Sequence, residues 1–305
     1  MRQLLRLPAR RAVPTVEELA EEFFTDLENA GKSPHTLVNY RADLRRFLRD
    51  GRAKTVGDIT PEVLRRYFTT LGRKAPATRA RHQASLNAFL EWCVKYDWLP
   101  SNPMDKIDRV KVPEPFPKGL PDETIRKILA AIPRENLRDR LLFTLIAETG
   151  VRVAEALGIY VEDLDLTPDD EKILVRGKGN KTRTVMLYAA PTTLRLLRRY
   201  LQQSALRSGP LFRSTRGSAV TPIHYRTAHA AWTKYCQKAG VTANIHALRH
   251  SFATSLINKG VRLEIVRKLL GHKNMQTTLR YAEVNDQTIK TELRQKWREV
   301  RFRQA

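Results

Sequence analysis

The stretch His246-Ala-Leu-Arg249-His250-Ser-Phe-Ala-Thr254 places two histidines and an arginine at the start of a predicted helix over about residues 247–258. Side chains three positions apart lie on one face of a helix, so His246 and Arg249 project together. The plainer interpretation is that the histidines are buried or capping residues of the fold. The stretch alone does not decide between a structural and a chemical role.

Three more stretches combine charged or nucleophilic residues with glycine. In Thr149-Gly-Val-Arg152-Val-Ala-Glu155, a glycine ends one predicted helix and Arg152 opens the next. Gly177-Lys178-Gly179 places a lysine at the tip of a predicted hairpin. Leu269-Leu-Gly271-His272 is followed, nine residues after the histidine, by Tyr281.

Each of these residues also has an ordinary structural interpretation. Arg152 can pair with Glu155 on a helix surface, Lys178 can be a solvated turn lysine, and Tyr281 can pack in a core. A metal site is not predicted, because the histidines lack an HExxH pattern or a neighbouring pair of carboxylates. Cys93 and Cys236 lie far apart and form no CxxC pair, which fits a reducing compartment.

The net charge predicts a polyanionic partner. The chain has 305 residues, with 55 lysines and arginines against 32 acidic residues, a net charge of +23. A protein this basic usually meets nucleic acid. No apolar run approaches 18 residues, so no membrane span or membrane partner is predicted.

A proline-rich stretch predicts two domains. Residues 111–121 hold four prolines, which exclude a helix or central strand and favour an extended linker. Residues 1–116 carry a net charge of +6 and residues 117–305 carry +17, so both parts are expected to face the polyanion. The expected division is a helical DNA-binding domain over 1–112, a linker over 113–121 and a second domain over 122–305.

The first segment is predicted to be a four-helix domain. Thr15-Val-Glu-Glu18 has the capping-box pattern, and it opens a helix to about residue 29. Helices are also expected over about 34–50, 61–71 and 76–97. One face of the second helix and the start of the fourth are basic. The candidate phosphate contacts are Arg41, Arg45, Arg46, Arg49, Arg79 and Arg81. A solvated charged face is the alternative.

The second segment is predicted to be mixed. Helices are expected over about 121–132, 137–148, 190–206, 222–238, 247–258 and 262–270. Residues 172–176 and 183–188 are rich in strand-forming residues, and a Gly/Asn turn over 177–181 separates them, which predicts a hairpin. The predicted fold class is therefore mostly α-helical with a small β-sheet.

Taken together and in order, the motifs Arg, Lys, His-x-x-Arg, Gly-His and Tyr resemble the catalytic signature of the tyrosine recombinases, the phage integrase family. The amino-acid sequences of the four stretches are similar to those of its Xer-like branch. The resemblance covers nearly the whole chain. It implies a SAM-like four-helix core-binding domain followed by an α+β catalytic domain.

The resemblance also implies roles for individual residues. Tyr281 would be the nucleophile, Arg152 and Arg249 would hold the scissile phosphate, and Lys178 would be the general acid. His246 would assist proton transfer, and His272 would support the transition state. Glu155 would orient Arg152 or the histidines.

These residue types suit phosphodiester chemistry in their own right. Attack on an anionic phosphate needs positive charge near the equatorial oxygens, and arginines supply it with fixed geometry. A lysine can protonate the leaving 5′ oxygen. Because arginine, lysine and histidine do this work, no cofactor and no metal are expected.

The predicted function is site-specific DNA recombination through a covalent 3′-phosphotyrosine intermediate, with dimer resolution or mobile-element integration as its setting. A type IB topoisomerase and a catalytically silent DNA-binding accessory protein are the alternatives. The expected partners are a double-stranded recombination site and three further subunits, identical or related, in a tetramer on two paired sites. The expected location is the cytoplasm, at the nucleoid.

The end of the chain is expected to form a tail helix over about residues 285–303. Ile289, Leu293, Trp297 and Val300 repeat at helical spacing and form an apolar stripe. Such a stripe must be buried, either on its own domain or, as the resemblance implies, on a neighbouring subunit.

Overall fold

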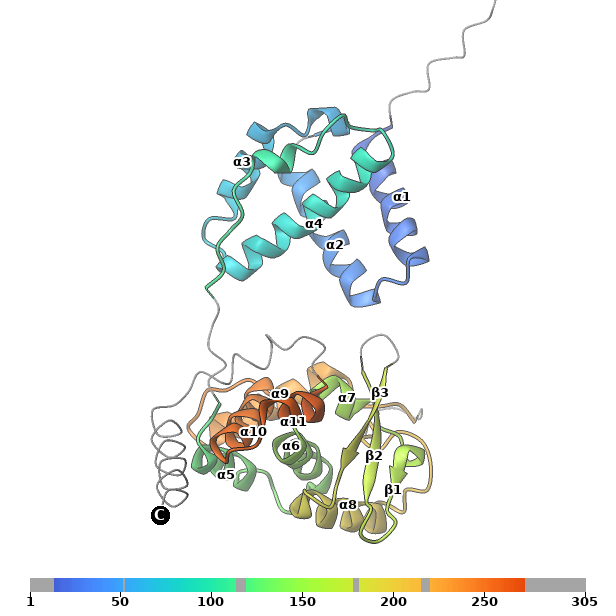
Figure 1. Cartoon of the computed structure of the whole chain (residues 1–305), viewed down its shortest axis with the longest axis vertical. Coiled ribbons are helices and arrows are strands. Elements are labelled where there is room, and N and C mark those ends of the chain that lie inside the picture. Colours follow the sequence, from blue (N-terminus) through green and yellow to red (C-terminus); the bar gives the residue numbers. More distant parts are fainter. Residues whose placement is uncertain (1–13, 52, 114–118, 178–180, 215–219, 272–305) are drawn as a thin grey trace, which may run out of the picture. The chain divides into compact units, whose positions relative to one another are not determined.

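The computed structural model describes residues 14–51, 53–113, 119–177, 181–214 and 220–271. The chain divides into two compact units, Met1–Glu114 and Pro115–Ala305, with the boundary inside the proline-rich stretch (Figure 1). Helices dominate both units, and a three-stranded sheet lies in the second. The predicted fold class, mostly α-helical with a small β-sheet, is confirmed.

The first unit begins its helices where the sequence predicts them. Thr15 Oγ1 accepts a hydrogen bond from the Glu18 backbone N–H at 3.2 Å, and the Glu18 carboxylate accepts one from the Thr15 N–H at 2.8 Å. This reciprocal pair confirms the capping box. The α-helices described in this unit are α1 (Val16–Asn29), α2 (Pro34–Gly51), α3 (Pro61–Thr70) and α4 (Pro76–Lys95). Short 3₁₀ turns cover Val56–Asp58 and Pro103–Lys106.

The core of the first unit is formed in part by apolar residues of α2 and α4. Leu44 and Phe47 of α2 are buried, as are Leu86 and Phe89 of α4. The Phe47 ring meets the Tyr67 ring of α3 edge to face, with 5.0 Å between centroids. Two arginines of α2, Arg45 and Arg49, are exposed.

Helices of the second unit surround α6. The α-helices described here are α5 (Asp122–Ala130), α6 (Leu137–Thr149), α7 (Val153–Leu157), α8 (Pro191–Ser204), α9 (Tyr225–Lys238), α10 (His246–Asn258) and α11 (Leu263–Leu270). A 3₁₀ turn covers Val161–Asp163. α6 packs against α5, α7, α8 and α10 (Figure 1). Six consecutive residues of α6 from Leu141 to Ile146 are buried, as expected of a helix enclosed by others.

One helix start differs from the sequence prediction. The helix expected from about residue 222 begins at Tyr225, because His224 caps it and its Nδ1 accepts a hydrogen bond from the Arg226 N–H at 3.2 Å. Pro222 instead forms an isolated β-bridge with Arg213.

The predicted hairpin is confirmed, and a third strand joins it. β2 (Lys172–Arg176) and β3 (Thr182–Met186) pair antiparallel, with Ile173 opposite Val185. β1 (Leu164–Asp165) pairs with the other edge of β2. The sequence did not predict β1, because two residues are too few to show strand periodicity.

No helix in the described ranges is long and apolar enough to cross a membrane.

Candidate active site

A tight junction of three helices positions Arg152. Gly150 ends α6 in the left-handed conformation, with φ at +64°, and its N–H donates to the Ile146 carbonyl at 3.0 Å. A Cβ at this position would lie 2.4 Å from Phe252 of α10 and 2.9 Å from Leu270 of α11. Only glycine fits, and its close approach holds the turn before Arg152 against α10 and α11.

Glu155 fixes the orientation of Arg152. Its carboxylate accepts the Arg152 backbone N–H at 2.9 Å and the Arg152 Nη1 at 2.7 Å. The Glu155 side chain is 5% exposed, whereas that of Arg152 is 41% exposed. Burial by itself raises the pKa of Glu155, but the Arg152 N–H and the charges of Arg183 and Arg152 outweigh it and lower the pKa below its usual value. Glu155 is therefore ionised, and it holds an arginine that faces solvent.

His246 and Arg249 lie beside Arg152, on the first turn of α10. The buried Arg249 guanidinium donates to the Gly150 carbonyl and, at 2.7 Å, to the Leu270 carbonyl. Removal from water lowers the pKa of His246, and the positive charges of Arg249 and Arg152 lower it further. The structure thus brings Arg152, His246 and Arg249 into one neighbourhood, where the imidazole is held neutral near pH 7.

A second arginine on Glu155 was not predicted from the sequence. Arg183 of β3 donates from Nη2 to Glu155 Oε2 and from Nη1 to the Leu269 carbonyl, both at 2.9 Å. A signal for it exists in the sequence, since strand alternation over 182–186 places Arg183 on the same face as the buried Val185. A charged residue at an inward strand position needs a specific partner.

Three of the predicted catalytic residues lie outside the described residues. They are Lys178, His272 and Tyr281, together with the predicted tail helix over 285–303. The structure describes the positions next to two of them. Gly177 donates its N–H to the Lys181 carbonyl at 2.7 Å across the base of the hairpin, and Gly271 ends α11 with φ at +64°.

The six arginines predicted to contact DNA lie in the first unit, and several have acidic partners there. Arg41 donates to Glu21 at 2.6 Å and to Glu28 at 3.2 Å, and it lies over the Phe24 ring at 4.3 Å. These contacts fix Arg41 between α1 and α2.

The remaining arginines of this set differ in exposure. Arg81 donates to the buried Asp43 at 2.5 Å, and both Arg46 and Arg49 lie within 3.5 Å of Asp50. Arg45 is exposed and Arg79 is partly buried.

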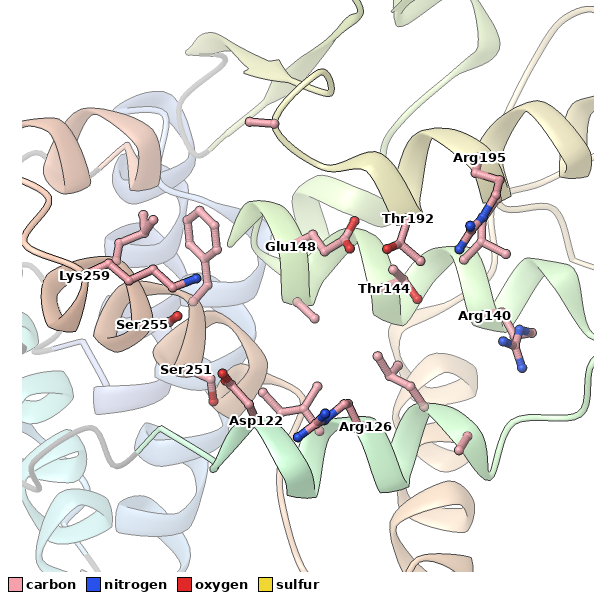
Figure 2. Close-up of a pocket in the computed structure, with 18 residues that line it drawn as sticks. Asp122, Arg126, Arg140, Thr144, Glu148, Thr192, Arg195, Ser251, Ser255 and Lys259 are labelled. Carbon is pink, nitrogen blue, oxygen red and sulfur yellow. The ribbon is translucent and has the colours of Figure 1, made fainter.

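A cavity of about 820 Å³ lies between α5, α6, α8 and α10, and none of Arg152, His246 or Arg249 lines it. Figure 2 labels the polar residues that line it. The cationic ones are Arg126, Arg140, Arg195 and Lys259, and the acidic ones are Asp122 and Glu148. Glu148 caps α8, accepting the Thr193 N–H and Oγ1 at 2.8 Å each.

Metal ligands do not cluster in the part of the chain that the structure describes, where no group of three or more histidine, cysteine, aspartate or glutamate side chains is placed to hold an ion.

Known proteins share both the sequence and the fold. Residues 118–288 match the phage integrase family and residues 20–96 match the phage integrase N-terminal SAM-like domain. Tyrosine recombinase XerA of Pyrococcus furiosus is 31% identical over 276 residues, covering 90% of this chain and 92% of the relative.

Two solved structures share the fold. XerH site-specific recombinase bound to palindromic difH substrate has a TM-score of 0.68 at 21% identity, covering 92% of this chain and 90% of XerH. A lambda integrase tetramer bound to a Holliday junction has a TM-score of 0.71 at 18% identity, covering 85% and 78%.

The helical SAM-like unit, the mixed second unit and the cluster around Arg152 define a recombinase of the phage integrase class. The chain belongs to the phage integrase family and is a tyrosine recombinase. The predicted enzyme class and the predicted function in site-specific recombination are confirmed.

Proposed function

We propose that this recombinase cuts one DNA strand with Tyr281, retains the 3′ phosphate as a phosphotyrosine, and passes it to a new 5′ hydroxyl. The Tyr281 phenol oxygen forms a bond to phosphorus while the bond from phosphorus to the 5′ oxygen breaks. The reverse reaction with another strand completes the exchange. Because the phosphotyrosine conserves the phosphodiester bond energy, no external energy source is needed.

The arrangement of Arg152 around Glu155 is the observation that carries this proposal. A guanidinium held by a buried carboxylate and still 41% exposed is ready to take a phosphate without losing its orientation. Arg249 is held from the other side by the Gly150 and Leu270 carbonyls. The two arginines would bind the non-bridging oxygens and stabilise the added charge of the transition state.

The proton transfers are assigned to the remaining residues. Lys178 would protonate the leaving 5′ oxygen. A neutral His246, favoured by its lowered pKa, can accept the phenolic proton of Tyr281. His272 would donate a hydrogen bond to the phosphate in the transition state.

Both units would hold the DNA. We assign residues 1–112 to a core-binding domain, 113–121 to the linker and 122–305 to the catalytic domain. Arg45, Arg46, Arg49, Arg79, Arg81 and Arg41 would supply or support phosphate contacts from the first unit. An enzyme of this kind acts where its DNA lies, so we place it in the cytoplasm, at the nucleoid.

The active assembly would be a tetramer on two paired sites. The apolar stripe of Ile289, Leu293, Trp297 and Val300 needs a partner surface. The cavity between α5, α6, α8 and α10 is a candidate surface for the tail of a neighbouring subunit, because apolar side chains form part of its lining. These side chains are Ile125, Leu129, Leu196, Phe252 and Leu256.

Deletion of residues 287–305 tests the assembly. We expect the truncated protein to bind one site with nearly unchanged affinity but to fail in pairing two sites, as measured by analytical ultracentrifugation on paired-site DNA. A truncated protein that still assembles four subunits and recombines at the normal rate would show that the tail only covers its own domain.

Trapping of a covalent complex tests the function itself. The DNA site is first selected from a random library with the purified protein, and then prepared as a nicked duplex that loses its 5′ end after cleavage. The wild-type protein should appear as a protein–DNA adduct on a denaturing gel, and Tyr281→Phe should form none while it binds the site. An adduct of equal yield in that variant would rule out Tyr281, and a wild type that forms none would favour the silent accessory protein.

A further inference from the structure

Arg183 occupies a position where a strand normally carries an apolar residue. It lies opposite Val175 in the β2–β3 ladder, and its neighbour on the same face, Val185, is buried. The Arg183 side chain is 18% exposed. An arginine so placed loses most of its hydration, so the contacts that it makes must compensate.

Its two contacts join two parts of the site that are remote in the sequence. One guanidinium nitrogen donates to Glu155, 28 residues away, and the other donates to the Leu269 carbonyl, 86 residues away. The Leu269 and Leu270 carbonyls belong to the last turn of α11, where a helix has no further N–H groups to satisfy them. Arg183 takes the first of these carbonyls and Arg249 takes the second.

The chain leaves α11 directly over the Arg183 side chain. A Cβ on Gly271 would lie 2.9 Å from Arg183 Cδ and 3.0 Å from Nε. Because φ of Gly271 is +64°, the backbone turns at this contact, and His272 is the next residue. The arginine therefore packs against the residue at which the backbone turns out of α11, one position before His272 in the sequence.

Arg183 also determines how strongly Glu155 holds Arg152. One carboxylate serves two guanidinium groups, through Oε1 and Oε2. Without Arg183, the whole negative charge would fall on Arg152 and would compete with a phosphate for it. A loss of Arg183 should therefore weaken the proposed phosphate contact and loosen the end of α11 together.

We propose that Arg183 is a positioning residue for strand cleavage, which ties the Glu155–Arg152 pair to the C-terminal end of α11. The proposal rests on the proposed function, because it assumes that Arg152 binds the scissile phosphate and that Tyr281 attacks it. Arg183 itself touches neither the phosphate nor the nucleophile in this assignment.

The test compares Arg183→Gln with Arg176→Gln in the full-length protein. Arg176 is a matched control, since it lies on β2 and forms a two-point pair with the buried Asp163 at 2.5 and 2.6 Å, on the exposed face of the sheet. The measurements are the single-turnover rate of adduct formation on the nicked duplex, the affinity for that duplex, and the melting temperature.

We expect Arg183→Gln to slow adduct formation about 100-fold, the effect of a small misplacement of catalytic groups, while DNA affinity changes less than threefold. Arg176→Gln should cut at the wild-type rate. Equal rates for the two variants, with wild-type adduct formation intact, would overturn the proposal. A wild type without an adduct would instead remove the proposed function.

Two further variants separate positioning from charge or folding. Arg183→Lys keeps the charge but cannot reach both Glu155 and the Leu269 carbonyl, so we expect it to remain folded at the assay temperature and still cut at least about tenfold slower. The double variant Arg183→Gln/Glu155→Gln should be no slower than the slower single variant, because the two residues act as one unit. Full activity in Arg183→Lys, or multiplied defects in the double variant, would contradict the inference.

Discussion

Asp43 in the first unit and Glu155 in the second are both buried carboxylates that pair with arginine, yet their surroundings differ. Asp43 accepts from Arg81 at 2.5 Å and from Ser85 at 2.8 Å, and His82 lies 3.3 Å away. These partners all come from α4, so the network joins α2 to α4. Glu155 instead accepts hydrogen bonds from Arg152 and Arg183. Its partner Arg152 lies near His246 and Arg249.

The difference shows how one kind of contact serves two purposes. Around Asp43, the ion pair and hydrogen bonds close a helix interface. Around Glu155, they hold two guanidinium groups, Arg152 and Arg183, in the neighbourhood of His246 and Arg249. The difference lies in these neighbours, because Arg152 and Arg81 are both 41% exposed. We therefore expect substitutions at Asp43 to change stability and substitutions at Glu155 to change the rate of strand cleavage.

Glu155→Gln should give the largest effect in this comparison. The amide keeps the shape of the side chain but removes the charge that orients Arg152, so we expect adduct formation to slow about 100-fold with little change in DNA affinity. The defect should persist on a duplex with a bridging 5′ sulfur, whereas a Lys178→Ala defect should recover, because a thiolate leaves without a proton. Recovery of Glu155→Gln on the sulfur substrate would place Glu155 with the proton donor instead.

Asp43→Asn should lower the free energy of unfolding by about 2 kcal/mol, because it breaks a buried pair whose arginine can return to water. At a temperature where the variant is folded, its rate of adduct formation should remain within about threefold of wild type. Chemical denaturation measures the free energy of unfolding, and the nicked-duplex assay measures the rate of adduct formation. A 100-fold slower cut in folded Asp43→Asn would erase the distinction between the two carboxylates.

A pH dependence at His82 should give the smallest effect. Burial lowers the pKa of His82, although the nearby Asp43 opposes this. The unfolded chain then binds the proton more readily, so the stability is complete above about pH 6.5 and falls as the pH drops below it. In the wild type, the urea concentration at which half of α4 is unfolded should be lower at pH 5.5 than at pH 7.5. Pulse-labelling hydrogen exchange of the α4 amides measures it. His82→Gln should flatten this change, and an unchanged slope in that variant would assign it to other groups.

Local signals in the sequence predicted much of the fold. The Thr15–Glu18 capping box and the Gly/Asn turn between β2 and β3 each act over a few residues, so they can be recognised without a structure. The motif order also indicated Arg152, His246 and Arg249 as candidates, and the structure brings these three together.

Contacts between distant residues could not be predicted in the same way. Arg183 meets Leu269 across 86 positions, and Arg41 meets Glu21 and Glu28 on another helix. β1 forms through antiparallel pairing with β2, with Leu164 opposite Ile173. Such features depend on how elements pack, and the pattern within any one element does not contain them.

The close fit at Gly150 gives the recombinase a safeguard. Phe252 and Leu270 fill the space where a side chain would stand, and the Gly150 carbonyl is itself bound by Arg249. If α11 detached in a local opening, Arg249 would lose its hydrogen bond to the Leu270 carbonyl, and Gly150 would lose its contact with the Leu270 side chain. A partly opened molecule would therefore have a disassembled site and would not cut DNA away from its assembled complex.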